Sequence, residues 1–186
     1  MRKSLILAFL CTAFAGLASA QIPTSGNVFF GYSYLNTNYN SGLPISGSGM
    51  NGWNGSVEGK IIPFLGFVGD ISSYYGSQSY TITCPAGQTC PTVNQNFSEQ
   101  NYLFGPRVSV SVGKFRPFAE ALFGAGHVNA NSLGSDTSFA TAIGGGLDYR
   151  LIRLVAWRFQ GDYVQTRFFD THQNNFRLST GIVVHF

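Results

Sequence analysis

Hydrophobic and polar residues alternate along most of the chain, so that every second side chain belongs to the same class. Because successive side chains of a β-strand point to opposite faces, this alternation predicts strands with one apolar and one polar face. The last segment shows it most clearly, with one face made of Phe176, Leu178, Thr180, Ile182, Val184 and Phe186. Similar segments, each near the length of a membrane-crossing strand, cover residues 28–36, 53–61, 64–75, 101–112, 115–127, 139–149 and 155–163.

The connectors between these eight segments alternate between long and short. The short ones are Ile62-Pro63, Gly113-Lys114 and Leu151-Ile152, and the long ones are residues 37–52, 76–98, 128–137 and 167–173. Outer-membrane barrels join their strands in this way, with short periplasmic turns and longer outer loops. The order predicts an all-β fold, an eight-stranded antiparallel up-and-down transmembrane β-barrel. With an even number of strands, both termini are expected on the periplasmic side.

The composition agrees with a surface that faces lipid. Charged residues make up 10% of the chain and aromatic residues 15%, whereas charged residues reach about 25% in soluble domains. No stretch after residue 20 is long and apolar enough to form a transmembrane helix. The other backbone arrangement that satisfies its hydrogen bonds in lipid is a closed barrel. The charge balance offers no argument for nucleic acid as a partner.

The first twenty residues have the features of a cleavable signal peptide. Arg2 and Lys3 precede an apolar stretch that ends in Ala18-Ser19-Ala20, a small-x-small cleavage site. We therefore expect residues 1–20 to be removed on export, which leaves one domain, the outer-membrane β-barrel of residues 21–186.

Three segments carry a resemblance to a known family. They are the C-terminal strand, which ends on Phe186, the segment Val28-Phe29-Phe30-Gly31-Tyr32-Ser33-Tyr34, and Gly144-Gly145-Gly146-Leu147-Asp148-Tyr149. Together they resemble the small bacterial outer-membrane β-barrels related to OmpA and OmpX. The resemblance implies a monomer in the outer membrane of a Gram-negative-type bacterium, surrounded by outer-membrane lipid. It also implies that Ile182, Val184 and Phe186 form the C-terminal signal read by the barrel-insertion machinery. Members of this family have structural, adhesive or resistance-related roles.

Charged residues on the inward face are the main candidates for function. A charge that faces lipid at mid-depth costs about 2–4 kcal/mol, so these groups belong in the lumen and should pair there. The interior of an eight-stranded barrel is just wide enough to be filled by side chains. We expect a structural plug, and the alternative is a narrow gated porin for small solutes. The predicted lumen network consists of Glu58, Arg107, Glu120 and Arg158, extended by Asp162 and Arg177.

Two further groups of residues lie near the predicted strand ends and loops. An aromatic girdle at the level of the lipid headgroups is expected from Trp53, Tyr75, Tyr102, Tyr149 and Trp157. Cys84 and Cys90 lie in the longest predicted loop, and an oxidising compartment allows them to form a disulfide that staples it. A surface adhesion or binding module acting through loops 37–52 and 76–98 is a second alternative function. The sequence names no extracellular ligand.

No pattern indicates an enzyme, a cofactor or a metal site. The segment Gly55-Ser56-Val57-Glu58-Gly59 does not place serine at the centre of a nucleophile elbow. The run 144–146 does not match the spacing of a dinucleotide-binding loop. The three histidines, His127, His172 and His185, are expected to be solvated at the barrel rims. The predicted loop with the two cysteines offers too few ligands for zinc.

Overall fold

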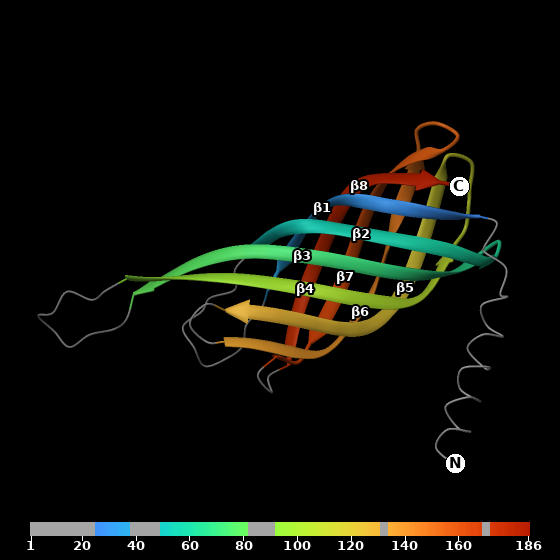
Figure 1. Cartoon of the computed structure of the whole chain (residues 1–186). Coiled ribbons are helices and arrows are strands. Elements are labelled where there is room, and N and C mark those ends of the chain that lie inside the picture. The colour runs from blue at the N-terminus through green and yellow to red at the C-terminus, as the bar shows by residue number, and fades with distance from the viewer. Residues whose placement is uncertain (1–24, 38–48, 82–91, 131–133, 169–171) are drawn as a thin grey trace, which may run out of the picture.

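The computed structural model describes residues 25–37, 49–81, 92–130, 134–168 and 172–186. These residues form a closed barrel in which each strand pairs with its neighbour in sequence and β8 pairs with β1 (Figure 1). All eight pairings are antiparallel, so the predicted fold is confirmed. The strands are β1 (Gly26–Asn36), β2 (Gly49–Ile62), β3 (Leu65–Thr81), β4 (Thr92–Ser109), β5 (Phe115–Ala130), β6 (Gly134–Arg150), β7 (Val155–Thr166) and β8 (Gln173–His185).

The two ends of the barrel differ in their connectors. At one end, which we call the turn end, short connectors join β2 to β3, β4 to β5 and β6 to β7, and the C-terminus lies there (Figure 1). Ile152 and Val155 exchange two backbone hydrogen bonds, so the last turn lies two residues later than predicted. Gly113 has a φ of 62°, a left-handed conformation that suits glycine in the turn before β5. The opposite end is called the loop end.

The strands at the loop end are longer than the alternation predicts. β3 continues to Thr81 and β4 begins at Thr92, so the predicted loop 76–98 is reduced to residues 82–91. β2 likewise begins at Gly49, and the predicted loop 128–137 lies largely within β5 and β6. These loop boundaries were wrong because the outward residues at this end, such as Ser77, Asn96 and Ser98, are polar. The hydrophobic alternation stops there, although backbone pairing continues, from Gly76 opposite Phe97 to Thr81 opposite Thr92. In Figure 1 the β3–β4 hairpin reaches farther than its neighbours.

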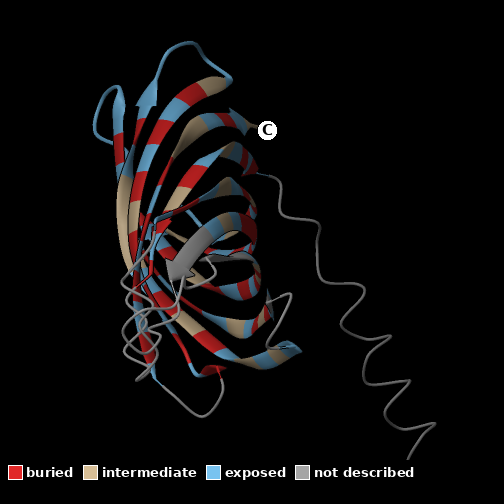
Figure 2. Ribbon diagram, turned by 90° about the vertical axis from the view of Figure 1, so that its left-hand side faces the viewer, coloured by how far each residue is buried: buried red, intermediate tan, exposed pale blue. Residues whose placement is uncertain are grey.

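The distribution of side chains is the reverse of that in a soluble protein. Buried and exposed residues alternate along the ribbons (Figure 2). The large side chains that point outward are apolar, such as Phe30, Ile71, Phe104, Ile143 and Phe159, all about half exposed or more. The buried inward positions include many polar and charged groups. Among the described residues, no helix is long and apolar enough to cross a membrane.

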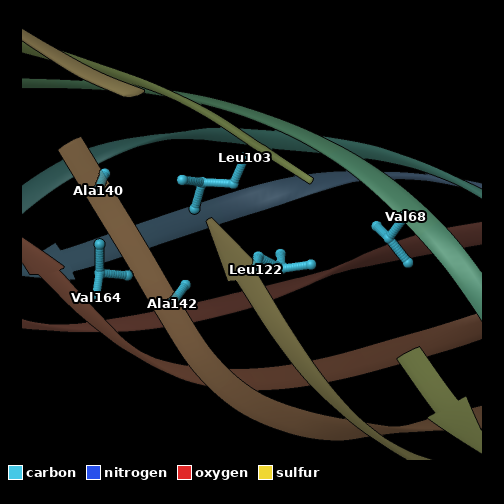
Figure 3. Packing of buried hydrophobic residues seen from close by; sticks show 6 residues of the cluster. All are labelled: Val68, Leu103, Leu122, Ala140, Ala142 and Val164. Atoms are coloured by element: carbon cyan, nitrogen blue, oxygen red, sulfur yellow. The ribbon is translucent and has the colours of Figure 1, made fainter. Parts of the chain in front are cut away.

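One side of the interior is nevertheless apolar. Val68, Leu103, Leu122, Ala140, Ala142 and Val164, from β3 to β7, form a buried cluster (Figure 3). Ala142 lies beside the larger Leu122 and Val164 on the neighbouring strands, so small and large side chains together fill the narrow space. Elsewhere the interior holds two smaller apolar clusters together with buried polar and charged groups.

The closure between β1 and β8 depends on close approach of the backbones. Gly31 lies opposite Gly181, and a Cβ atom added to either would fall 2.2–2.3 Å from a backbone oxygen of the other strand. This distance is far below van der Waals contact, so no side chain fits without displacing a strand. The two glycines therefore allow the last strand to pair with the first.

Candidate functional site: the charged lumen

Strand register places three ion pairs directly across from each other. Arg107 lies opposite Glu120, Asp148 opposite Arg158, and Asp162 opposite Arg177, all on the inward face. Directly opposed residues in an antiparallel pair have Cβ atoms about 5 Å apart, within reach of an ion pair. The arginine Nε donates to the carboxylate in each pair, at 2.6, 2.6 and 2.7 Å respectively. Arg158 makes a second bond at 2.9 Å through Nη2, so that pair is bidentate.

Three further contacts cross the lumen between strands that are not neighbours. The carboxylate of Glu58 on β2 accepts a bond from Arg116 Nη2 of β5 at 2.7 Å and one from Arg107 Nη1 of β4 at 3.3 Å. Arg177 Nη1 of β8 donates to Asp70 Oδ1 of β3 at 2.7 Å. These bonds link strands that are two or three positions apart around the barrel.

Neutral amides connect the charged pairs into one network. Gln160 donates to both Glu120 and Asp162, at 2.8 and 2.9 Å. Asn27 donates to Glu58 Oε2 at 2.7 Å, and Asn54 donates to Asp70 Oδ2 at 2.8 Å. The resulting lumen network therefore runs from Arg116 near the turn end to Arg177 beyond mid-barrel. It comprises four arginines (Arg107, Arg116, Arg158, Arg177), five carboxylates (Glu58, Asp70, Glu120, Asp148, Asp162) and these amides.

The network is shielded from solvent. Arg107, Arg158 and Arg177 have no exposed surface, and neither does Glu58. Two aromatic rings fill space beside the guanidinium groups. Arg158 stacks over Phe118 at 4.6 Å and over Phe29 at 5.0 Å, while Arg107 lies 4.5 Å from the Phe118 ring centre. Such stacking stabilises a desolvated cation by about 2 kcal/mol, so the two rings help to stabilise the buried guanidinium groups.

The sequence predicted the members of the network better than their partners. All six predicted residues, Glu58, Arg107, Glu120, Arg158, Asp162 and Arg177, are buried and lie within it. Arg158 pairs with Asp148, which was not among the six. Asp70 and Arg116 were also missing. The alternation along each strand places all three side chains inward. Which residues pair depends on the register between strands, and the closed sheet sets that register.

Glu99 is a buried carboxyl that the sequence analysis did not single out. It lies on β4 between the outward-facing polar residues Ser98 and Gln100, beyond the apolar outward run that begins at Tyr102. It has no exposed surface, and Asn101 Nδ2 donates to its Oε1 at 2.9 Å. Its Oε2 has no hydrogen-bond partner among the described residues. Burial raises the pKa of this carboxyl to about 7, although the Asn101 bond lowers it.

The other predicted site residues lie as follows. His127 and His172 are at the loop end, and His127 Nδ1 lies 2.7 Å from Thr137 Oγ1. His185 is less solvated than expected, because it is partly buried with Nε2 3.3 Å from Arg116 Nη1. No group of three potential metal ligands occurs within the described ranges. Cys84 and Cys90 lie outside the described residues.

The predicted aromatic residues all point outward, toward both ends of the barrel. Tyr149 and Trp157 face each other on β6 and β7 near the turn end. Trp53 and Tyr102 lie toward the loop end, and Tyr75 lies still farther along. The predicted C-terminal signal, Ile182, Val184 and Phe186, is also exposed on the outer face.

The fold is shared with known proteins, whereas the sequence is not. No family model matches the chain, and no curated protein matches it. The Neisserial surface protein A is similar in structure, with a TM-score of 0.65 at 16% identity over 86% of this chain and 96% of that one. Ail, the attachment invasion locus protein of Yersinia pestis, is also similar in its complex with the heparin analogue sucrose octasulfate. The TM-score is 0.57 at 15% identity, over 86% of this chain and 97% of that one. These likenesses confirm the fold predicted from the resemblance to small outer-membrane barrels.

Proposed function

We propose that the chain is a monomeric structural barrel of the bacterial outer membrane, with a lumen that does not conduct. The observation that carries this proposal is the buried lumen network, which links strands that are not neighbours through Glu58 and Arg177. It is enclosed by an outer surface whose large exposed side chains are apolar. Exposing such an apolar surface to water is unfavourable, whereas contact with lipid is favourable.

The energetics favour a lumen that stays closed. Opening a path for ions requires that Arg177 separate from Asp70 and that Arg107 and Arg116 separate from Glu58. Separating one buried ion pair leaves uncompensated charge and costs about 3–5 kcal/mol. Two such events together would lower the open population by several orders of magnitude. The charges are therefore assigned to holding the barrel together, and the proposed role is not enzymatic.

Single-channel conductance tests the closed lumen. Protein purified from the outer-membrane fraction is placed in a planar bilayer, as wild type and as Arg177→Ala. The control is Arg153→Ala, at an exposed position in the turn between β6 and β7. We expect no discrete openings in the wild type or the control, and brief openings at most in Arg177→Ala. Regular wild-type openings whose size changes in Arg177→Ala would instead establish the narrow gated porin.

The same preparation tests the location. A folded barrel migrates faster in unheated than in heated detergent gels, and it should be found with the outer membrane. Both termini are proposed to lie on the periplasmic side, with residues 1–20 removed on export. A tag after Phe186 that antibodies reach on intact cells would contradict this orientation. Recovery of the protein in the soluble fraction would refute the membrane proposal.

We further propose that the barrel-insertion machinery recognises the outward face of β8. Ile182, Val184 and Phe186 present a continuous apolar edge there, since each is exposed by two-fifths or more. The backbone of Phe186 also exchanges two hydrogen bonds with Gly26. A signal at this position would be available before the barrel closes, because β8 pairs with β1 last in chain order.

A further inference from the structure

The outer surface near the loop end carries a shallow groove across β2 to β5. It has a volume of about 600 Å³ and is lined mainly by amide, hydroxyl and tyrosine side chains. We call this groove the outer shelf and define it by Asn51, Tyr75, Asn96, Ser98 and Asn129. None of these side chains carries a formal charge.

Register makes the outer shelf a continuous row. Asn51 lies opposite Tyr75, Tyr75 opposite Ser98, and Ser98 opposite Asn129, so four adjacent strands contribute one outward residue each. Neighbouring strands are about 4.8 Å apart, so the row presents polar side chains at regular intervals. Asn96 lies two residues beyond Ser98 and extends the row toward the loop end.

The outer shelf lies just beyond the lipid-facing surface. On β4, Gln100 lies two residues from Ser98 toward the turn end, and Tyr102 lies two residues farther. Tyr102 is opposite Ile71 and Ala125 in an apolar row. Tyr75 is four residues from Ile71, about 13 Å along the strand and about 10 Å along the barrel axis for a strand tilted by about 40°. This depth is that of the lipid headgroups. Tyr75 therefore lies above the level at which Tyr102 meets the edge of the apolar surface.

The side chains of the outer shelf can still form bonds. Within the described residues, Asn96, Ser98 and Asn129 make no side-chain hydrogen bond. Asn51 Oδ1 accepts a bond from Tyr32, so its Nδ2 remains a donor. The Tyr75 side chain is 57% exposed. Amides that both donate and accept, beside an exposed aromatic ring, suit the hydroxyls and the apolar face of a sugar ring.

From this arrangement we propose that the outer shelf binds the uncharged saccharide of a membrane glycolipid. The absence of charged lining residues favours a neutral sugar over a phosphate group. The shelf faces sideways, at headgroup depth, so a sugar attached to a neighbouring lipid reaches it without leaving the membrane. The inference rests on the proposed membrane location and is independent of whether the lumen conducts.

Nuclear magnetic resonance in nanodiscs tests the proposal. The protein is placed in phosphatidylcholine nanodiscs with increasing amounts of a digalactosyl diacylglycerol, whose headgroup is a neutral disaccharide. The side-chain amide signals of Asn51, Asn96 and Asn129 report on the shelf directly. We expect them to shift and saturate with the glycolipid. We expect no shift with added phosphatidylcholine, and free digalactoside should need at least a hundredfold higher concentration because it is not held at the surface.

Matched variants separate the shelf from the remaining surface. Tyr75→Ala should weaken binding about tenfold, because it removes the stacking surface, and Asn129→Ala should weaken it severalfold. The controls are Tyr149→Ala, an outward tyrosine at the turn end, and Asn174→Ala, an outward asparagine on β8. Both controls should bind as the wild type does.

Three outcomes would overturn the proposal. The first is unchanged binding by both shelf variants, and the second is equal loss in the controls. The third is equally strong binding of free digalactoside, which would contradict a lipid source for the sugar. Failure of the protein to enter nanodiscs would instead refute the membrane location, so the two proposals fail in different ways.

Discussion

Replacing Glu99 by glutamine should make the barrel more stable at alkaline pH. The carboxyl is fully buried, opposite Tyr74 on β3 and Val128 on β5. Among the described residues, Asn101 donates a hydrogen bond to it and no cation pairs with it. Glutamine has nearly the same shape and carries no charge. The variant therefore removes the cost of burying a carboxylate and leaves the packing intact.

The magnitude follows from the pKa of Glu99, which burial raises from 4.5 to about 7. A raised pKa means that the folded state holds its proton more tightly than the unfolded state. Stability from this group is then complete below pH 4.5 and is lost as the pH rises through about 7. A shift of about 2.5 pH units corresponds to roughly 3 kcal/mol. Between pH 4 and pH 9, the wild type should lose about this much relative to Glu99→Gln.

The assay is urea unfolding in lipid, followed by tryptophan fluorescence at several pH values from 4 to 9. Other carboxyls also titrate in this range, so the quantity of interest is the difference between variant and wild type at each pH. Asp136→Asn, at the loop-end rim where Asp136 accepts a bond from the Thr137 amide, is the matched control. A difference that does not change with pH, or that changes equally in the control, would refute the reasoning.

Three further outcomes are expected. Arg177→Leu leaves two buried carboxylates unpaired and should lower the free energy of unfolding by about 3–5 kcal/mol; a loss below about 1 kcal/mol in urea titration would contradict the proposed network. Gly31→Ala should abolish the fast-migrating folded band in detergent gels because its Cβ would meet a backbone oxygen, whereas Gly69→Ala, with open space around it, should not. Phe186→Ala should reduce assembly in cells while the purified protein still folds in detergent, and equal loss in both settings would argue against an insertion signal.

The strands and the inward or outward direction of their side chains could be predicted from the sequence. Alternation is a local property, because the geometry of an extended backbone sends neighbouring side chains to opposite faces whatever the rest of the fold does. This placed Arg107, Arg158 and Arg177 inside the barrel and Phe104 and Phe159 outside, as the structure has them. The alternation of long and short connectors, together with a composition poor in charge, was enough to predict a closed membrane barrel.

Pairing within the lumen could not be predicted, because it depends on register summed around all eight strands. Arg158 meets Asp148 only because β6 and β7 are aligned so that these positions are opposite. Glu58 meets Arg107 and Arg116 across the lumen only because the barrel closes with a particular stagger. A shift of two residues in any pairing would keep every side chain on its face and change these partners.

The strand ends at the loop end were also decided by the tertiary structure. There the outward residues, such as Ser77 and Asn96, are polar, so the hydrophobic alternation ends although β3 and β4 remain paired. The same extension buries Glu99 and lines up Asn51, Tyr75, Ser98 and Asn129 on four strands. The local pattern thus determined which face each residue occupies. Only the closed sheet determined which residues share a depth, because depth depends on hydrogen bonds between segments distant in sequence.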